Sequence, residues 1–242
     1  MTTSVFLAVL LAALLHATWN SLVKSSADAH ATMLAITIGH VPTALILLPF
    51  SLPINLDAIP WILAGIMLHV GYQLSLVASY KTGDLTVVYP IARGSAPLIV
   101  TIISISFLGI AFTSSQLIGV ALIVLGLFTL ALVKNSNGTR SPISIAMALC
   151  TGMFIASYSL VDGMGARIAS SALGFWSLSA IGNAIAFSFF ISLSHPKSFK
   201  LIKTDRNVML IGLGGGTASF IAYGLGSRRL CTCCRPSCSS LP

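Results

Sequence analysis

An arginine stands inside a long apolar segment of the sequence, where Arg93 lies between Pro90 and Pro97. If that segment crosses a bilayer, the charge costs about 2.5–3.5 kcal/mol to insert and needs a partner. The two prolines release backbone carbonyls and predict a broken helix of the kind that lines cavities. Tyr89 lies one turn earlier on the same face, so its phenol can flank the guanidinium. Such a planar cation suits a carboxylate or phosphate on a ligand. The alternative is an arginine that snorkels to the membrane surface or has a structural role, bound to backbone carbonyls.

Polar side chains recur at helical spacing in the first apolar segment. His16 and Asn20 lie four residues apart, with Trp19 beside them and Lys24 one turn further along. This spacing places the polar groups on one face of a helix, and we expect that face to point into a helix bundle. For His16 and Asn20, ligand binding and hydrogen bonding between helices are equal alternatives. Lys24 is more typical of a residue that marks the membrane surface.

Later apolar segments carry similar polar and aromatic groups, which could hold an amphipathic or aromatic solute, although each aromatic residue alone is more typical of packing. Asp162 is expected near a helix end, a position more typical of an interface than of a proton carrier. The candidate solute-binding residues are Arg93, Tyr89, His16, Trp19, Asn20, His69, Tyr72, Gln73, Tyr158 and Asn183.

The sequence offers little for catalysis. It contains no H-E-x-x-H motif and no G-x-x-x-x-G-K-[ST] loop, and His16 and His69 lack the further ligands that a metal site needs. Four cysteines lie within residues 231–238, in a spacing that matches no standard zinc site. We therefore predict no catalytic residue, no metal and no cofactor. Residues 226–242, rich in Cys, Ser and Arg, are interpreted as an aberrant tail without ordered structure.

The elements that must position these groups are apolar segments. Hydrophobic residues make up 56% of the 242 residues and charged residues only 7%, against about 25% charged residues in a soluble domain. This composition predicts an all-α polytopic membrane protein. Thr113 and Gln116 predict a capping box before the fifth segment. Eight transmembrane helices are expected near residues 4–23, 32–52, 59–80, 85–107, 114–133, 143–162, 172–193 and 207–225.

Charge and glycine spacing add predictions about topology and packing. The net charge is +8, but Lys and Arg occur without a basic face, which argues against nucleic acid as a partner. They concentrate in the loops after segments 1, 3, 5 and 7, so the positive-inside rule places the N-terminus outside. Gly119 with Gly126, and Gly212 with Gly216, predict close approach of helices.

A polar linker at Lys134–Arg140 divides the chain into a five-helix part and a shorter remainder. The first and sixth segments end alike, in Ser21-Leu-Val-Lys24 and Ser159-Leu-Val-Asp162. Because each repeat would hold an odd number of helices, the repeats would be inverted in the membrane, as in many secondary transporters. We predict a first repeat over 1–134, a partial second repeat of three helices over 135–225, and the tail over 226–242.

Two segments carry a resemblance to a known family. Leu14–Lys24 resembles the first helix of EamA-type transporters of the drug/metabolite transporter superfamily, and Val88–Pro97 resembles their fourth helix. The similarity extends over about residues 4–224 and implies ten helices in two five-helix repeats that move small metabolites, often outward, across the bacterial inner membrane. The sequence departs from the family in holding eight spans and no glutamate, and the charge rule gives the opposite orientation to that of several members.

These observations lead to one expectation about function and two alternatives. We expect a secondary transporter that exports a small metabolite and is not an enzyme. Its partners would be a small solute and membrane lipid. The alternatives are an inactive truncated fragment of such a transporter and, less favoured, an intramembrane enzyme.

Overall fold

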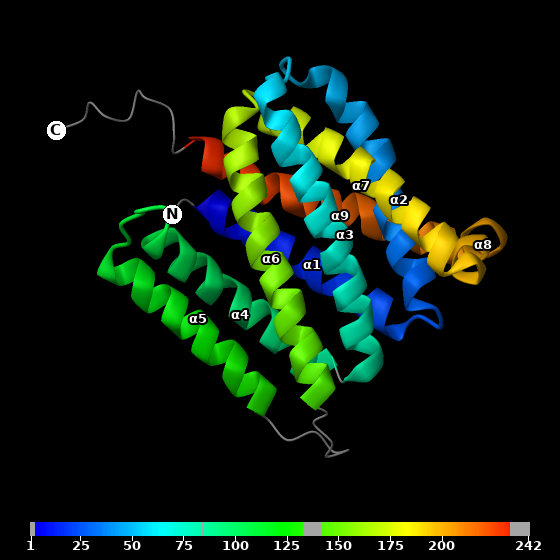
Figure 1. Cartoon of the computed structure of the whole chain (residues 1–242), viewed down its shortest axis with the longest axis horizontal. Helices are drawn as coiled ribbons and strands as arrows, with labels where there is room; N and C mark the ends of the chain where they lie inside the picture. Colours follow the sequence, from blue (N-terminus) through cyan, green and yellow to red (C-terminus); the bar gives the residue numbers. More distant parts are fainter. Residues whose placement is uncertain (1–2, 84, 133–141, 233–242) are drawn as a thin grey trace. The chain divides into compact units, whose positions relative to one another are not determined.

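The computed structural model of the protein describes residues 3–83, 85–132 and 142–232, and every regular element in these ranges is a helix (Figure 1). The all-α prediction is therefore confirmed for the described residues. The long helices are α1 (Thr3–Ser25), α2 (Ala29–Leu47), α3 (Ile59–Thr82), α4 (Leu85–Ser106), α5 (Ser114–Leu132), α6 (Pro142–Ile168), α7 (Ala172–Ser194) and α9 (Arg206–Thr232). Between them lie the nine-residue α8 (Pro196–Thr204) and two 3-10 turns, η1 (Leu48–Phe50) and η2 (Leu56–Ala58).

Each predicted span lies on one long helix, and the ends agree within five residues except at the C-terminal ends of α6 and α9, which lie six and seven residues further along. In the described part of the chain, five segments are long and apolar enough to cross a membrane: Ala29–Phe50, Leu56–Thr82, Thr86–Ser106, Pro142–Ile168 and Ala172–Ser194. They indicate a multi-pass membrane protein, and the count of eight spans stays a prediction. The last helix differs from its predicted end near residue 225, because α9 continues as helix to Thr232. The predicted lack of order after residue 226 is therefore wrong for these residues.

Short polar side chains fix where several helices begin. Thr113 and Gln116 form the predicted capping box, with the Thr113 N–H donating to Gln116 Oε1 at 2.8 Å and the Gln116 N–H donating to Thr113 Oγ1 at 3.4 Å. Ser171 caps α7 by accepting from the Gly174 N–H at 3.2 Å. Asp28 caps α2 by accepting from two backbone N–H groups. Each cap satisfies N–H groups that a helix start would otherwise leave without a partner.

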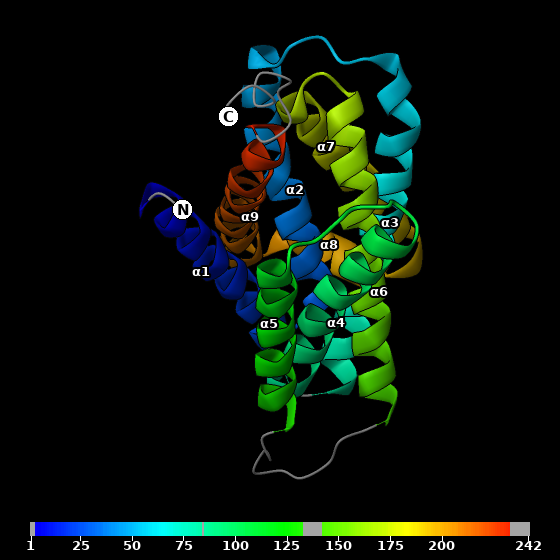
Figure 2. The same ribbon diagram turned by 90° about the vertical axis from the view of Figure 1, so that its left-hand side faces the viewer.

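The chain divides into two compact units, residues 1–67 with 162–242, and residues 68–161. In the first unit, α2 packs against α7 and α9, and α9 lies between α1 and α2 (Figure 2). The helices α2 and α9 meet backbone to backbone, since a Cβ added to Gly216 would lie 2.6 Å from the Gly39 Cα and one added to Gly212 would lie 2.6 Å from the Ala35 carbonyl oxygen. The close approach predicted for Gly212 and Gly216 is confirmed.

In the second unit α4 packs against α5, through Gly94, whose added Cβ would lie 3.2 Å from Leu127 Cβ. Gly119 and Gly126 take no part in this contact, because a Cβ at either would meet nothing within 4 Å in the described structure. The close packing predicted for these two glycines is therefore wrong. The contact with α4 instead uses the large side chains of α5 near residues 127 and 128.

The compact units do not follow the predicted repeats, because their boundaries fall within α3 and α6 and not at the linker. Units of this kind reflect packing, whereas the repeats are a proposal about sequence and symmetry. The division at residues 134 and 225 therefore stays a prediction, and the linker at 133–141 lies outside the described residues.

Candidate functional site

Arg93 lies within α4 in the second unit, and both flanking prolines are inside the same helix. The helix continues unbroken from Leu85 to Ser106, so the predicted break at the prolines is wrong. A proline removes a single N–H, and neighbouring helix turns can absorb that loss. Pro97 has no N–H to donate to the carbonyl of Arg93 four residues earlier. One turn further along, the Thr101 hydroxyl donates to the Pro97 carbonyl at 2.8 Å.

The Arg93 guanidinium is surrounded by tyrosines. Its Cζ lies 5.7 Å from the centre of the Tyr89 ring, within the range of a cation–π contact. A side-chain hydrogen bond joins it to Tyr72 of α3, and Tyr158 of α6 is a further electrostatic neighbour. The Nη2 atom is shielded from solvent and has no hydrogen-bond partner among the described residues. A buried donor of this kind has a hydrogen bond still to make, and an anionic ligand could accept it.

Aromatic contacts extend this group to a histidine. The His69 ring stacks on the Tyr158 ring with centroids 4.2 Å apart and an interplanar angle of 23°. Tyr158 also meets Tyr72 edge to face, with centroids 5.4 Å apart. Tyr72 and Tyr158 are both buried. The five side chains of Arg93, Tyr89, Tyr72, Tyr158 and His69 thus form one connected group, which we call the Arg93 cluster.

Small residues bring the three helices of the cluster close enough for these contacts. A Cβ added to Gly152 of α6 would collide with Ser95 Oγ and lie 2.9 Å from the Ala92 carbonyl oxygen of α4. On the other side of α6, the Ser79 and Thr151 hydroxyls share a hydrogen bond of 3.2 Å between α3 and α6. Helical periodicity places His69 and Tyr72 near one face of α3, because residues three apart share a helix face. The packing of α6 against α3 then brings Tyr158 into contact with both rings.

Arg93 has no acidic residue within the described part of its own unit. The acidic residues of the chain are Asp28, Asp57, Asp84, Asp162 and Asp205. Of these, only Asp84 falls within residues 68–161, and it lies outside the described residues. In the described part of this unit, the guanidinium therefore has phenol groups and aromatic rings as neighbours, and there is no carboxylate. A bound anion would supply the missing negative charge.

The remaining candidates are distributed differently. Gln73 is buried beside Tyr72 on α3. Asn20 of α1 and Asn183 of α7 belong to the other unit and are also buried, with 1% and 6% of their surfaces exposed. The side chains of His16 and Trp19 lie outside the described residues. The structure thus brings five of the predicted residues into direct contact, while Asn20 and Asn183 occur in a different unit.

Asp162 differs from its predicted setting. The helix α6 continues for six residues beyond it to Ile168, and only 1% of the Asp162 surface is exposed. A Cβ added to Gly65 of α3 would lie 2.6 Å from Asp162 Oδ1. The glycine thus makes room for a carboxylate inside the helix packing. The expectation of a helix-end aspartate was wrong because α6 ends at Ile168, with Arg167 in its last turn, and not near Asp162.

Sequence reasoning also missed a polar contact in the first unit. Ser198 Oγ of α8 donates to Asp28 Oδ2 at 2.7 Å, and the His195 ring stacks on His30 with centroids 4.0 Å apart. The capping pattern of Asp28 and His30 could have been recognised from the sequence. The partners on α8 could not, since 170 residues separate Asp28 from Ser198.

Among the residues that the structure describes, no group of three or more His, Cys, Asp or Glu side chains is placed to hold a metal ion. Over the described ranges, the regular elements are all helices, and the five long apolar segments indicate a membrane protein that holds a cationic, aromatic-lined group of side chains. No family model, no curated protein and no solved structure matches the chain.

Proposed function

We propose that the protein is a secondary transporter of the EamA type that exports a small anionic metabolite across the bacterial inner membrane. The observation that carries this proposal is the guanidinium of Arg93, which lies in an apolar helix with a buried Nη2 that has no partner among the described residues. Ionisable groups inside membrane spans are costly and usually serve transport or binding. The resemblance of Leu14–Lys24 and Val88–Pro97 to EamA-type helices supports the same class.

The chemistry of the Arg93 cluster favours binding over catalysis. Its members are one guanidinium, three phenols and one imidazole. A fixed cation beside aromatic faces attracts a carboxylate or phosphate and holds an apolar body, and it does not require a bond to be made or broken. His69 is the member of the cluster that could carry a proton if export is coupled to a proton gradient.

The experiment is an export assay in cells that express the full chain. Organic anions that accumulate in the medium are quantified by mass spectrometry and compared with cells that express Arg93→Ala at equal membrane abundance. We expect the variant to lose the accumulation, and Arg93→Lys to recover little of it because an ammonium lacks the planar fork. The matched control is Arg167→Ala, which removes an exposed arginine from the last turn of α6.

This assay distinguishes a ligand-binding role of Arg93 from a structural one. Wild-type accumulation in cells that express Arg93→Ala would overturn the proposal, since a merely structural arginine can be dispensable for export. Equal loss in the Arg167→Ala control would also contradict it, because the effect would then follow from charge removal anywhere in the protein.

A further inference from the structure

The helix α8 occupies a fixed place in the chain between two long helices. One residue, His195, separates it from α7, and one residue, Asp205, separates it from α9. Because α7 is one of the segments long and apolar enough to cross a membrane, α8 begins where that span ends. A nine-residue helix with three lysines is too short and too charged to enter the hydrocarbon. Its length, its charge and its place next to the end of a span are those expected of a helix at the membrane surface.

Two contacts hold one face of α8 against α2. The Ser198 hydroxyl donates to Asp28 Oδ2, and only 6% of the Ser198 surface is exposed. The His195 ring, at the start of α8, stacks on the His30 ring at an interplanar angle of 26°. The other oxygen of Asp28, Oδ1, accepts from the His30 and Ala31 backbone N–H groups at 3.0 and 3.1 Å. The rotation of α8 about its own axis is thereby set.

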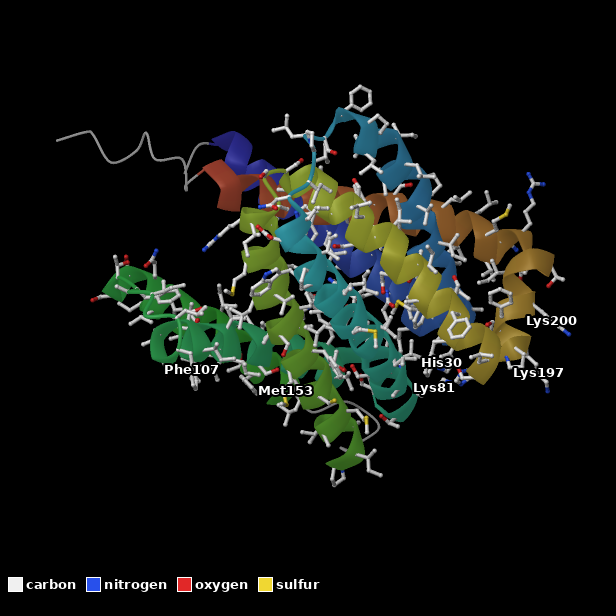
Figure 3. The ribbon with its side chains drawn as sticks, turned by 45° about the horizontal axis from the view of Figure 1, so that its top comes forward. His30, Lys81, Phe107, Met153, Lys197 and Lys200 are labelled. Carbon is white, nitrogen blue, oxygen red and sulfur yellow. The ribbon has the colours of Figure 1, made fainter. Side chains whose placement is uncertain are left out.

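This rotation turns two lysines outward. Lys197 and Lys200 are exposed and extend from α8 away from His30 (Figure 3). Arg206, the first residue of α9, is exposed as well. The nearby carboxylate of Asp205 is engaged with its own backbone, since Oδ1 accepts from the Asn207 and Val208 N–H groups at 2.8 and 3.4 Å. The outer face of α8 therefore presents cations, at a height where lipid headgroups lie.

We propose that Lys197, Lys200 and Arg206 form a binding site for the phosphate groups of anionic phospholipids. Basic side chains close to an anionic membrane surface attract its headgroups, and an arginine adds paired hydrogen bonds to phosphate oxygens. The contacts of Ser198 and His195 hold the cations in place before lipid binds, which lowers the entropy lost on binding. The site lies in a different unit from the Arg93 cluster and is independent of the solute proposed for that cluster.

The experiment is native mass spectrometry of the full detergent-solubilised chain with added phosphatidylglycerol or phosphatidylcholine. We expect wild-type protein to retain phosphatidylglycerol in preference to phosphatidylcholine. Lys197→Gln with Lys200→Gln should reduce the retained phosphatidylglycerol about tenfold, since each cation near an anionic surface contributes to the attraction. The matched control is Lys81→Gln with Arg167→Gln, which removes the same charge from two other exposed positions and should retain the lipid.

A second variant tests whether lipid binding depends on the charge of these two positions and not on the lysine side chains themselves. Lys197→Arg with Lys200→Arg keeps the charge and should retain phosphatidylglycerol as wild type does. Three outcomes would overturn the proposal: equal retention of both lipids by the wild type, equal loss in the control variant, or undiminished phosphatidylglycerol binding by the glutamine variant. If the glutamine variant unfolds, Lys200→Gln alone serves in its place, with a smaller loss expected and unchanged retention again contradicting the proposal.

Discussion

Gly216 of α9 lies directly against Gly39 of α2, so that a Cβ on Gly216 would stand 2.6 Å from the Gly39 Cα and 2.5 Å from the Ile36 carbonyl oxygen. In membranes, helices associate through close packing of this kind, because lipid is as apolar as the side chains and provides no hydrophobic drive between helices. The two helix backbones can therefore approach this closely only because these glycines have no Cβ.

The first prediction tests that contact. Gly212→Leu should lower the melting temperature by about 3–10 °C, because overpacking by a buried side chain costs roughly 1–3 kcal/mol in a chain of this size. Gly214→Leu is the matched control on the same helix, since nothing in the described structure lies within 4 Å of a Cβ there. Thermal unfolding of both variants in detergent gives the comparison, and equal melting temperatures would contradict the packing shown by α2 and α9.

The second prediction concerns the hydroxyl that bonds Arg93. Tyr72→Phe keeps the ring that meets Tyr158 but removes the hydrogen bond to the guanidinium. Hydrogen bonds to charged groups contribute about 1.5–3 kcal/mol, so we expect export in the assay above to fall at least about tenfold. Thr129→Val removes an exposed hydroxyl that donates to its own helix and should leave export unchanged. Wild-type export by Tyr72→Phe would exclude a role for this hydroxyl.

The third prediction is a pH dependence at the start of α2. Burial alone raises the pKa of the Asp28 carboxyl, but the Ser198 hydroxyl, the Ala31 and His30 backbone N–H groups and the charge of His30 together hold that pKa below its ordinary value of 3.8. A carboxyl whose pKa is lower in the folded state stabilises the fold above its ordinary pKa and loses this effect as the pH falls through the folded value.

Asp28→Asn should therefore be less stable than wild type at pH 6 to 7, and the difference should shrink below pH 4. Ser198→Ala should show a smaller difference with the same trend, since it removes one of the bonds that Asp28 accepts. Melting temperatures from pH 7 down to about pH 2.5 give both curves, so that the range covers the pH values below 3.8 at which the folded carboxyl takes up its proton. A difference that stays constant across that range would show that Asp28 acts without its charge.

The fourth prediction concerns orientation and rests on the sequence. A reporter inserted between Lys134 and Arg140 should report the cytoplasm, because Lys and Arg concentrate in loops of that parity. A reporter inserted after Ile168, between α6 and α7 and in a loop of the opposite parity, should report the outside. An extracytoplasmic signal from the linker would favour the orientation described for several EamA-type proteins over the charge rule.

The helices were predictable because long apolar segments in a membrane must form helices. The tertiary contacts could not be predicted in this way. The apolar segments and the capping box of Thr113 and Gln116 can be read from local sequence. The nine residues of α8 were not predicted as a helix, because three lysines interrupt their apolar pattern. The prolines of α4 predicted a break that the continuous helix does not show, since neighbouring turns absorb a single missing N–H.

The candidate site was predictable in its residue types but not in its grouping. Arg93 with Tyr89, and His69 with Tyr72, follow from helical spacing within one segment. Their union with Tyr158 depends on how α6 packs against α3 and α4 at Gly152, a contact between residues distant in sequence. Asn183 was also among the candidates, although it belongs to the other unit.

The hydrogen bond between Ser79 and Thr151 marks a position where α3 and α6 can be cross-linked in cells. Their oxygens lie 3.2 Å apart between α3 and α6, so the pair Ser79→Cys and Thr151→Cys is spaced for a reversible disulfide. All five native cysteines are replaced by serine to prevent competing bonds. Oxidation would lock the two helices together and reduction would free them. Export measured in both states would tell whether these helices must slide past each other once per solute molecule or stay joined throughout the cycle.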